Sequence, residues 1–144
     1  MPTRQSILNN LKDDMDNNFT VANGFTKVYE IRVGVYDPDE FPVFPGIGIW
    51  ITDDRAEEDL MDDVVFRRLN MVIYGHVDSD MMEQYNSFYT LISDVEQFLY
   101  STYNRVYKNV ILGDVEITYG GATSQTGMFV INFSILYSQT GLES

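Results

Sequence analysis

The sequence predicts a single α+β domain, with about five strands in a mostly antiparallel or mixed β-sheet and two main helices packed on one face. The length of 144 residues fits one domain, spanning 1–144, at about 100–200 residues per domain. Apolar residues make up 44% of the chain, which is enough to build a core. The strand patterns come in runs, in the order α-β-β-β-α-β-β, and this favours an α+β layer over alternating β-α units.

Two helices are predicted from apolar stripes at helical spacing. The first covers residues 3 to about 17, with Thr3 as the N-cap. Its stripe consists of Ile7, Leu8, Leu11 and Met15. The second covers about residues 80–100, where apolar positions recur at spacings of four, three, four, three and four. These positions are Met81, Tyr85, Phe88, Ile92, Val95 and Leu99.

Five strands are predicted from alternation of apolar and polar residues. We expect them at about residues 27–36, 47–51, 66–77, 110–119 and 128–138. In the second strand the isoleucines face one way, while Gly46, Gly48 and Trp50 leave the other face nearly bare. Glycine at such positions indicates that another backbone or side chain packs close.

Two segments are predicted to be long loops. Residues 53–63 hold seven acids and one base, and because like charges repel we expect a loop or a short, frayed helix. The acids are Asp53, Asp54, Glu57, Glu58, Asp59, Asp62 and Asp63. Residues 120–127 form a small-residue, uncharged loop, whose candidate contact residues are Gly120, Gly121, Thr123, Ser124, Gln125, Thr126 and Gly127. Loops of this kind in a small domain are often contact elements.

The charge and composition exclude several classes of protein. A net charge of −13 argues against a basic nucleic-acid reader and against a protein held on anionic lipid. The chain has no cysteine and one histidine, which removes thiolate zinc sites, Fe–S clusters and the usual His-rich metal sites. No signal peptide or membrane-spanning stretch is visible, so cytosolic synthesis is the expectation.

No motif points to catalysis, and we expect no enzyme, no cofactor and no metal. His76 with Asp78 as its orienter offers an acid–base pair, but no nucleophile accompanies it and a structural role is favoured. The acidic run lacks the glycine and the alternation of a calcium-binding loop, so a solvated loop is favoured there. Tyr100, Tyr103 and Tyr107 fit an interface about as well as packing at the end of the second helix.

Several local patterns carry a family resemblance over most of the chain. They are the amphipathic start at 6–11, the proline-containing turn and strand at 37–50, the acidic segment, the strand at 68–77 that leads into a long helix, the helix end at 94–99, and the closing strand, Gly-rich loop and strand. In this order they resemble the tail terminator (tail completion) proteins of long-tailed bacteriophages.

This resemblance implies a structural virion protein of the tail neck, assembled in the host cytoplasm. It implies a homohexameric ring at the head-proximal end of the tail tube, which stops tube polymerisation and docks the head-side connector. The partners are then other copies of the chain, the tail tube protein and a connector or neck protein, with DNA only as passing cargo and no membrane. We hypothesise that some of the seven acids line the lumen or meet a basic patch, and that 120–127 reaches an adjacent subunit or the tube.

Two alternatives to the terminator remain open. The nearest is another neck protein, a head-completion or connector subunit. The other is an acidic inhibitor that mimics DNA, which the charge permits, although seven of the 22 acids cluster in one segment instead of forming a phosphate-like array.

Overall fold

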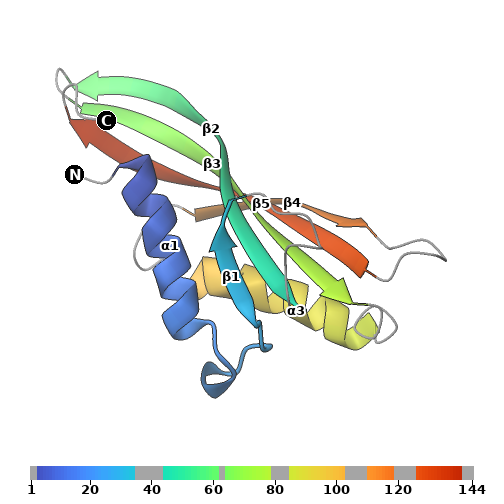
Figure 1. Cartoon of the computed structure of the whole chain (residues 1–144). Coiled ribbons are helices and arrows are strands. Elements are labelled where there is room, and N and C mark those ends of the chain that lie inside the picture. Colours follow the sequence, from blue (N-terminus) through green and yellow to red (C-terminus); the bar gives the residue numbers. More distant parts are fainter. Residues whose placement is uncertain are drawn as a thin grey trace.

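The computed structural model describes residues 3–34, 44–61, 64–78, 85–102, 110–118 and 126–140. The helical elements are α1 (Arg4–Asn18), the short 3-10 helix η1 (Val21–Asn23), α3 (Tyr85–Gln97) and the π-helical turn η3 (Phe98–Thr102). The strands are β1 (Glu30–Val33), β2 (Gly46–Met61), β3 (Val64–Asp78), β4 (Val110–Thr118) and β5 (Thr126–Thr140) (Figure 1). The predicted order of helices and strands is therefore confirmed.

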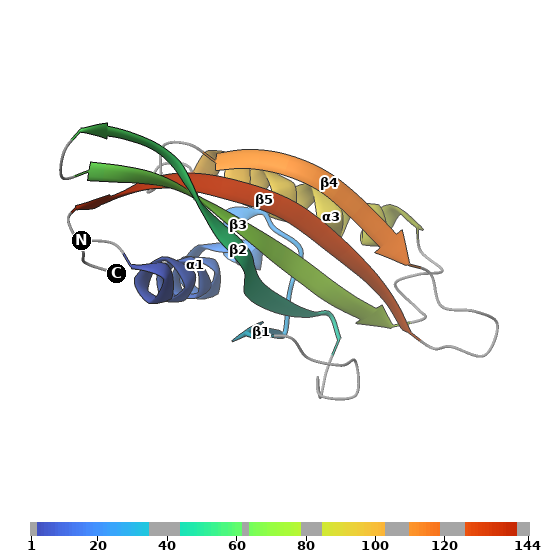
Figure 2. The same ribbon diagram turned by 90° about the horizontal axis from the view of Figure 1, so that it is seen from above.

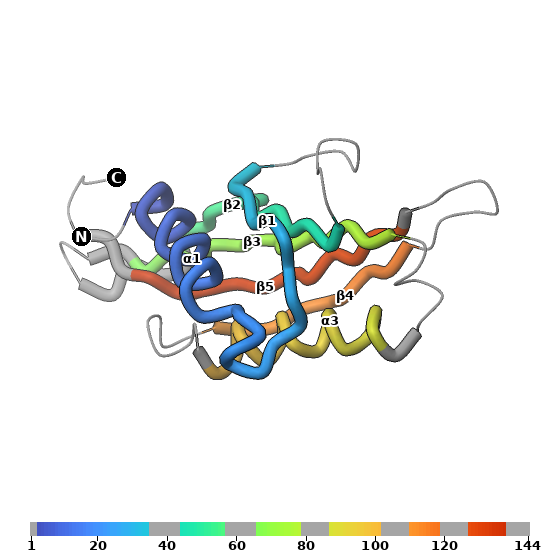
Figure 3. Tube along the Cα trace, turned by 60° about the horizontal axis from the view of Figure 1, so that its bottom comes forward, coloured from blue at the N-terminus to red at the C-terminus, as the bar shows by residue number. Residues whose placement is uncertain are grey.

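The five strands form one mixed sheet in the order β1-β2-β3-β5-β4. β1 is parallel to β2, and every other neighbouring pair is antiparallel. The long strands β2, β3 and β5 continue past the start of α1, while α3 runs beneath β5 and β4 (Figures 1 and 2). Both helices cover the same side of the sheet, as predicted (Figure 3).

The core lies between this side of the sheet and the two helices. The predicted stripe of α1 is buried, and Thr3 caps the helix through a reciprocal pair of hydrogen bonds with Ser6. The predicted apolar face of β5 is also buried, at Phe129, Ile131, Phe133, Ile135 and Tyr137. Among the described residues, no helix is long and apolar enough to cross a membrane.

The prediction of close packing at the second strand is confirmed at Gly48. The ring of Tyr74 on β3 lies directly over this glycine, so a Cβ there would clash with the ring. The Tyr74 hydroxyl donates a hydrogen bond to the carbonyl of Gly34, just beyond β1. One side chain thus spans from β3 across β2 to the end of β1.

The acidic segment is not the predicted loop or frayed helix. Residues 53–61 continue strand β2 and pair with the first part of β3, with bulges on the way. Pairing and nearby arginines override the repulsion between neighbouring acids, because strand formation depends on cross-strand context. Asp62 and Asp63 lie outside the described residues.

The second predicted loop, residues 120–127, overlaps strand β5 at its last two residues. Thr126 and Gly127 begin β5 and pair with Asp78 and Val77 of β3. The other candidate contact residues of this segment lie outside the described residues: Gly120, Gly121, Thr123, Ser124 and Gln125.

Candidate functional site

The two leading acids of the run point to opposite sides of the sheet. A bulge follows Ile51, so Asp53 pairs with Asn70 and Asp54 with Leu69. Asp53 accepts a hydrogen bond from the Asn70 amide and pairs with Arg55 at 3.3 Å on the side opposite α1 and α3. Asp54 turns to the helix side, where its side chain is only 7% exposed. The run is therefore not one continuous acidic surface.

Asp54 is the centre of a polar cluster that joins four elements. Its Oδ1 accepts from Nε of Arg67 on β3 at 2.9 Å, and its Oδ2 accepts from the hydroxyl of Tyr137 on β5 at 2.7 Å. Arg4, in the first turn of α1, also donates to Oδ2. The cluster ties the start of α1 to three strands where the apolar core ends.

The cluster raises the pKa of Arg4, chiefly through its hydrogen bond to Asp54, and shifts the pKa values of Asp54 and Tyr137. Burial alone raises the pKa of Asp54, but hydrogen bonds from Tyr137, Arg4 and Arg67 outweigh burial and hold that pKa below its ordinary value. Burial, together with the hydrogen bond to Asp54, raises the pKa of Tyr137 to about 12. Near neutral pH the pair is a carboxylate and a neutral phenol, which is the arrangement of a structural anchor.

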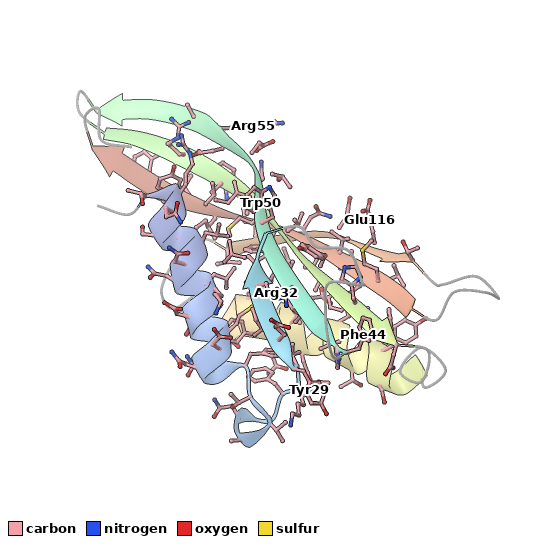
Figure 4. The ribbon with its side chains drawn as sticks, in the orientation of Figure 1. Tyr29, Arg32, Phe44, Trp50, Arg55 and Glu116 are labelled. Carbon is pink, nitrogen blue, oxygen red and sulfur yellow. The ribbon has the colours of Figure 1, made fainter. Side chains whose placement is uncertain are left out.

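The side of the sheet opposite the helices, here called the open face, carries exposed apolar side chains. Trp50 on β2 is 43% exposed and Ile111 on β4 is 50% exposed. Figure 4 shows Trp50, Arg55 and Glu116 on the side of the sheet away from α1 and α3. A depression of about 300 Å³ crosses this face, lined by Thr52, Asp53, Asn70, Met71, Ile111, Gly113, Asn132, Phe133 and Ser134.

A second exposed surface lies on the outer side of α3 and η3. Tyr89 is 44% exposed and Tyr100 is 64% exposed, with Ser93 exposed between them. Opposite them, Phe88, Leu91 and Val95 are buried in the core. The exposure of Tyr100 is consistent with an interface at the end of the second helix. Tyr103 and Tyr107, the other two tyrosines of that prediction, lie outside the described residues.

A third surface is the groove between the end of α1 and β1. Its volume is about 340 Å³, and its lining includes Phe19, Val21, Lys27 and Tyr29. The ammonium of Lys27 sits 4.8 Å from the centre of the Tyr29 ring, as in a cation–π contact. Tyr29 itself is 55% exposed, and it is labelled in Figure 4.

His76 lies inside the fold. It is 3% exposed, and its ring packs edge-on against Tyr74 with 5.6 Å between the centroids. In the described part of the chain, no group of three or more His, Asp or Glu residues is placed to hold a metal ion.

Sequence reasoning did not single out Trp50, Ile111 or Tyr89 as surface residues. Of these, only Trp50 belonged to a pattern in the sequence, the nearly bare strand face that it shares with Gly48. That pattern was interpreted as close packing of another segment, not as an exposed surface. Glu57, Glu58 and Asp59 lie within strand β2. No protein-family model matches the chain, and the comparison with curated proteins gives no match either.

Proposed function

We propose that this chain is a structural subunit of a bacteriophage neck, a tail terminator that forms a ring on the head-proximal end of the tail tube. The observation that carries the proposal is that the described helices α1 and α3 pack on the same side of the sheet. Helices pack on one side, while the other side presents Trp50 and Ile111 to solvent. Such a subunit has contact surfaces on two opposite sides, and the sequence patterns that resemble terminators support the same reading.

A ring follows from two-sided contacts by symmetry. When one surface of a subunit binds a different surface of the next, repetition closes a ring if the rotation divides a full turn. One small α+β domain is sufficient for this, and the subunits then enclose a channel. An acidic wall would repel DNA phosphates and let the DNA slide past.

Within this proposal, six of the seven acids remain candidates for the channel wall. Asp54 is engaged inside the subunit, so it serves the fold. Asp53, Glu57, Glu58, Asp59, Asp62 and Asp63 remain the proposed lumen or partner residues.

The decisive experiment is tube capping. Tail tube protein of the virus that encodes the chain is polymerised with and without the purified chain, and tube lengths are measured by negative-stain imaging. A terminator shortens the tubes and appears as a ring at one end. Tubes of unchanged length, with the chain co-sedimenting with head-side connector instead of tubes, would replace the terminator by another neck protein. Inhibition of a DNA-binding enzyme without either contact would favour the DNA mimic.

Two variants test the assigned segments within that function. Charge reversal at Asp53, Glu57 and Glu58 should impair assembly or DNA passage, and normal assembly with normal DNA ejection would remove their role. Deletion of residues 120–125 should weaken rings or tube capping. Intact rings that cap tubes normally would remove the role of that loop.

A further inference from the structure

Two surfaces of this acidic chain are nearly uncharged. Around the depression on the open face, the uncharged side chains Thr52, Asn70, Asn132 and Ser134 lie beside Trp50 and Ile111. The charged residues on strand positions around them are Asp53, Arg55, Arg68, Asp114 and Glu116, three acids against two arginines, so this surface carries little of the chain's net charge of −13. On the outer side of α3 and η3, Tyr89, Ser93 and Tyr100 are exposed, and Glu96 is half-buried.

These two surfaces lie on opposite sides of the molecule. α3 packs on the helix side of the sheet through Phe88, whose ring meets Phe129 of β5 edge-on at 6.2 Å. Its exposed tyrosines therefore face away from the sheet, while Trp50 points from the other side (Figure 4). A contact between them joins different surfaces of two subunits and is heterologous.

We propose that the outer face of α3 and η3 in one copy packs on the open face around Trp50 in the next copy. This inference rests on the proposed function and names the subunit contact of the ring. Two copies of a chain with a net charge of −13 repel each other, and the repulsion is weakest where surfaces of low net charge meet. Both halves of the proposed contact lie on this one chain, so the proposal commits to a second copy as the partner.

The chemistry of the two surfaces is complementary. Tyrosine and tryptophan are the residues most typical of interface centres, since they bury a large apolar area at low entropic cost. The depression offers the amides of Asn70 and Asn132 and the hydroxyl of Ser134, which are partners for a tyrosine hydroxyl. A tyrosine ring entering beside Ile111 would therefore bury its carbon atoms and keep its hydroxyl bonded.

The sheet edges are poorer candidates for joining copies. β1 has only four residues, and β4 is interrupted by a bulge between Leu112 and Val115. Short strands and bulges are the usual means of preventing edge-to-edge pairing. The faces of the subunit are thus better suited to the contact than its edges.

Complementary variants test the contact. One chain carries Trp50→Glu on the open face, and a second carries Tyr89→Glu with Tyr100→Glu on the helix face. The wild-type chain should form a multi-subunit ring in light scattering, and each variant alone should be a monomer. An equimolar mixture should give a two-chain species and nothing larger, because each variant keeps one intact surface and the two are complementary.

Controls keep this test decisive. Tyr29→Glu places the same charge on an exposed tyrosine of the α1–β1 groove and should leave assembly unchanged. Circular dichroism and melting identify folded variants. If Trp50→Glu does not fold, Thr52→Glu in the same depression replaces it.

Several results would overturn the inference. Assembly of the helix-face variant by itself would indicate contact between two open faces, and wild-type assembly of both variants would place the contact elsewhere. A wild-type chain that stays monomeric at its highest soluble concentration also overturns it. Tube capping separates this from the proposed function, since Trp50→Glu rings that cap normally refute only the contact, while a wild-type chain that ignores tubes refutes the terminator.

Discussion

The helix-facing side of the sheet is apolar beneath α3 and polar beneath the first turn of α1. Under α3, the Phe129 ring lies over Gly75 of the neighbouring strand and meets Phe88 edge-on. Tyr137 lies eight residues further along β5 on the same face, and its hydroxyl donates a hydrogen bond to Asp54. The alternation of buried and partly exposed residues along β5 continues to Tyr137. The stabilising contribution changes, however, from burial of apolar side chains at Phe129 to hydrogen bonds and ion pairs around Asp54. One face of one strand thus holds both apolar core residues and the tyrosine that joins the polar cluster at the edge of that core.

The largest expected loss comes from the apolar region. Phe129→Ala removes a fully buried ring and leaves a cavity against Gly75 and Phe88. The free energy of unfolding should fall by about 3–5 kcal/mol, measured by urea denaturation. A loss below about 1 kcal/mol would mean that the ring contributes no more than an average surface position. The energetic difference between the apolar region beneath α3 and the polar region beneath α1 would then disappear.

Asp54→Ala should cost somewhat less. It leaves Arg67 and the Tyr137 hydroxyl without their acceptor, and we expect a loss of about 3 kcal/mol in the free energy of unfolding. The matched control is Asp53→Ala, next in sequence and paired with exposed Arg55, which should cost at most about 1 kcal/mol. Equal losses for the two variants would show that the inward position of Asp54 does not matter.

The Asp54 effect should depend on acidity. Because the pKa of Asp54 is held below its ordinary value, its stabilisation is present above the ordinary aspartate pKa and is lost as pH falls through the lower folded pKa. The difference between the wild-type chain and Asp54→Ala should therefore shrink in strong acid. A constant difference across acid denaturation curves would contradict the lowered pKa.

Tyr137→Phe tests one hydrogen bond of the cluster. Its removal should cost about 1.5 kcal/mol, because the acceptor is charged and keeps two arginine donors. The pKa of Tyr137 is raised to about 12, so the stabilisation it gives is full below its ordinary pKa and is lost as pH rises toward 12. The wild-type chain should thus lose stability more steeply than Tyr137→Phe in this alkaline range, and parallel curves would argue against the shift.

Arg4→Ala should have the smallest effect. Its side chain is 48% exposed, so water already screens its pairing with Asp54. We expect a change below about 1 kcal/mol in the free energy of unfolding. A larger loss would make the first turn of α1 an essential part of the cluster, and hydrogen exchange in α1 would then rise with the substitution.

The sequence predicted what local periodicity controls. The stripe of Ile7, Leu8, Leu11 and Met15 and the alternation from Phe129 to Tyr137 are both buried as expected. Each pattern can be read within one segment, because a helix or strand must place its apolar residues on one side. The strand order, by contrast, depends on contacts between distant segments.

The acidic run was misread for the same reason. Counting charges between residues 53 and 63 suggested repulsion, but the neutralising partners of Asp54 are Arg4 and Arg67, which lie elsewhere in the sequence. The exposure of Trp50 and Tyr89 could not be predicted from the sequence either, because aromatic residues occur both in cores and at interfaces. Only the three-dimensional neighbours decide between these outcomes.

The Tyr74 ring over Gly48 has a consequence for how this sequence can change over time. Any side chain at position 48 collides with the ring, and loss of the ring removes the bond to the Gly34 carbonyl. The two positions must therefore vary together. A descendant with alanine or serine at 48 should carry a smaller residue at 74, and the lineage can cross between the two pairings only through an intermediate that folds less well.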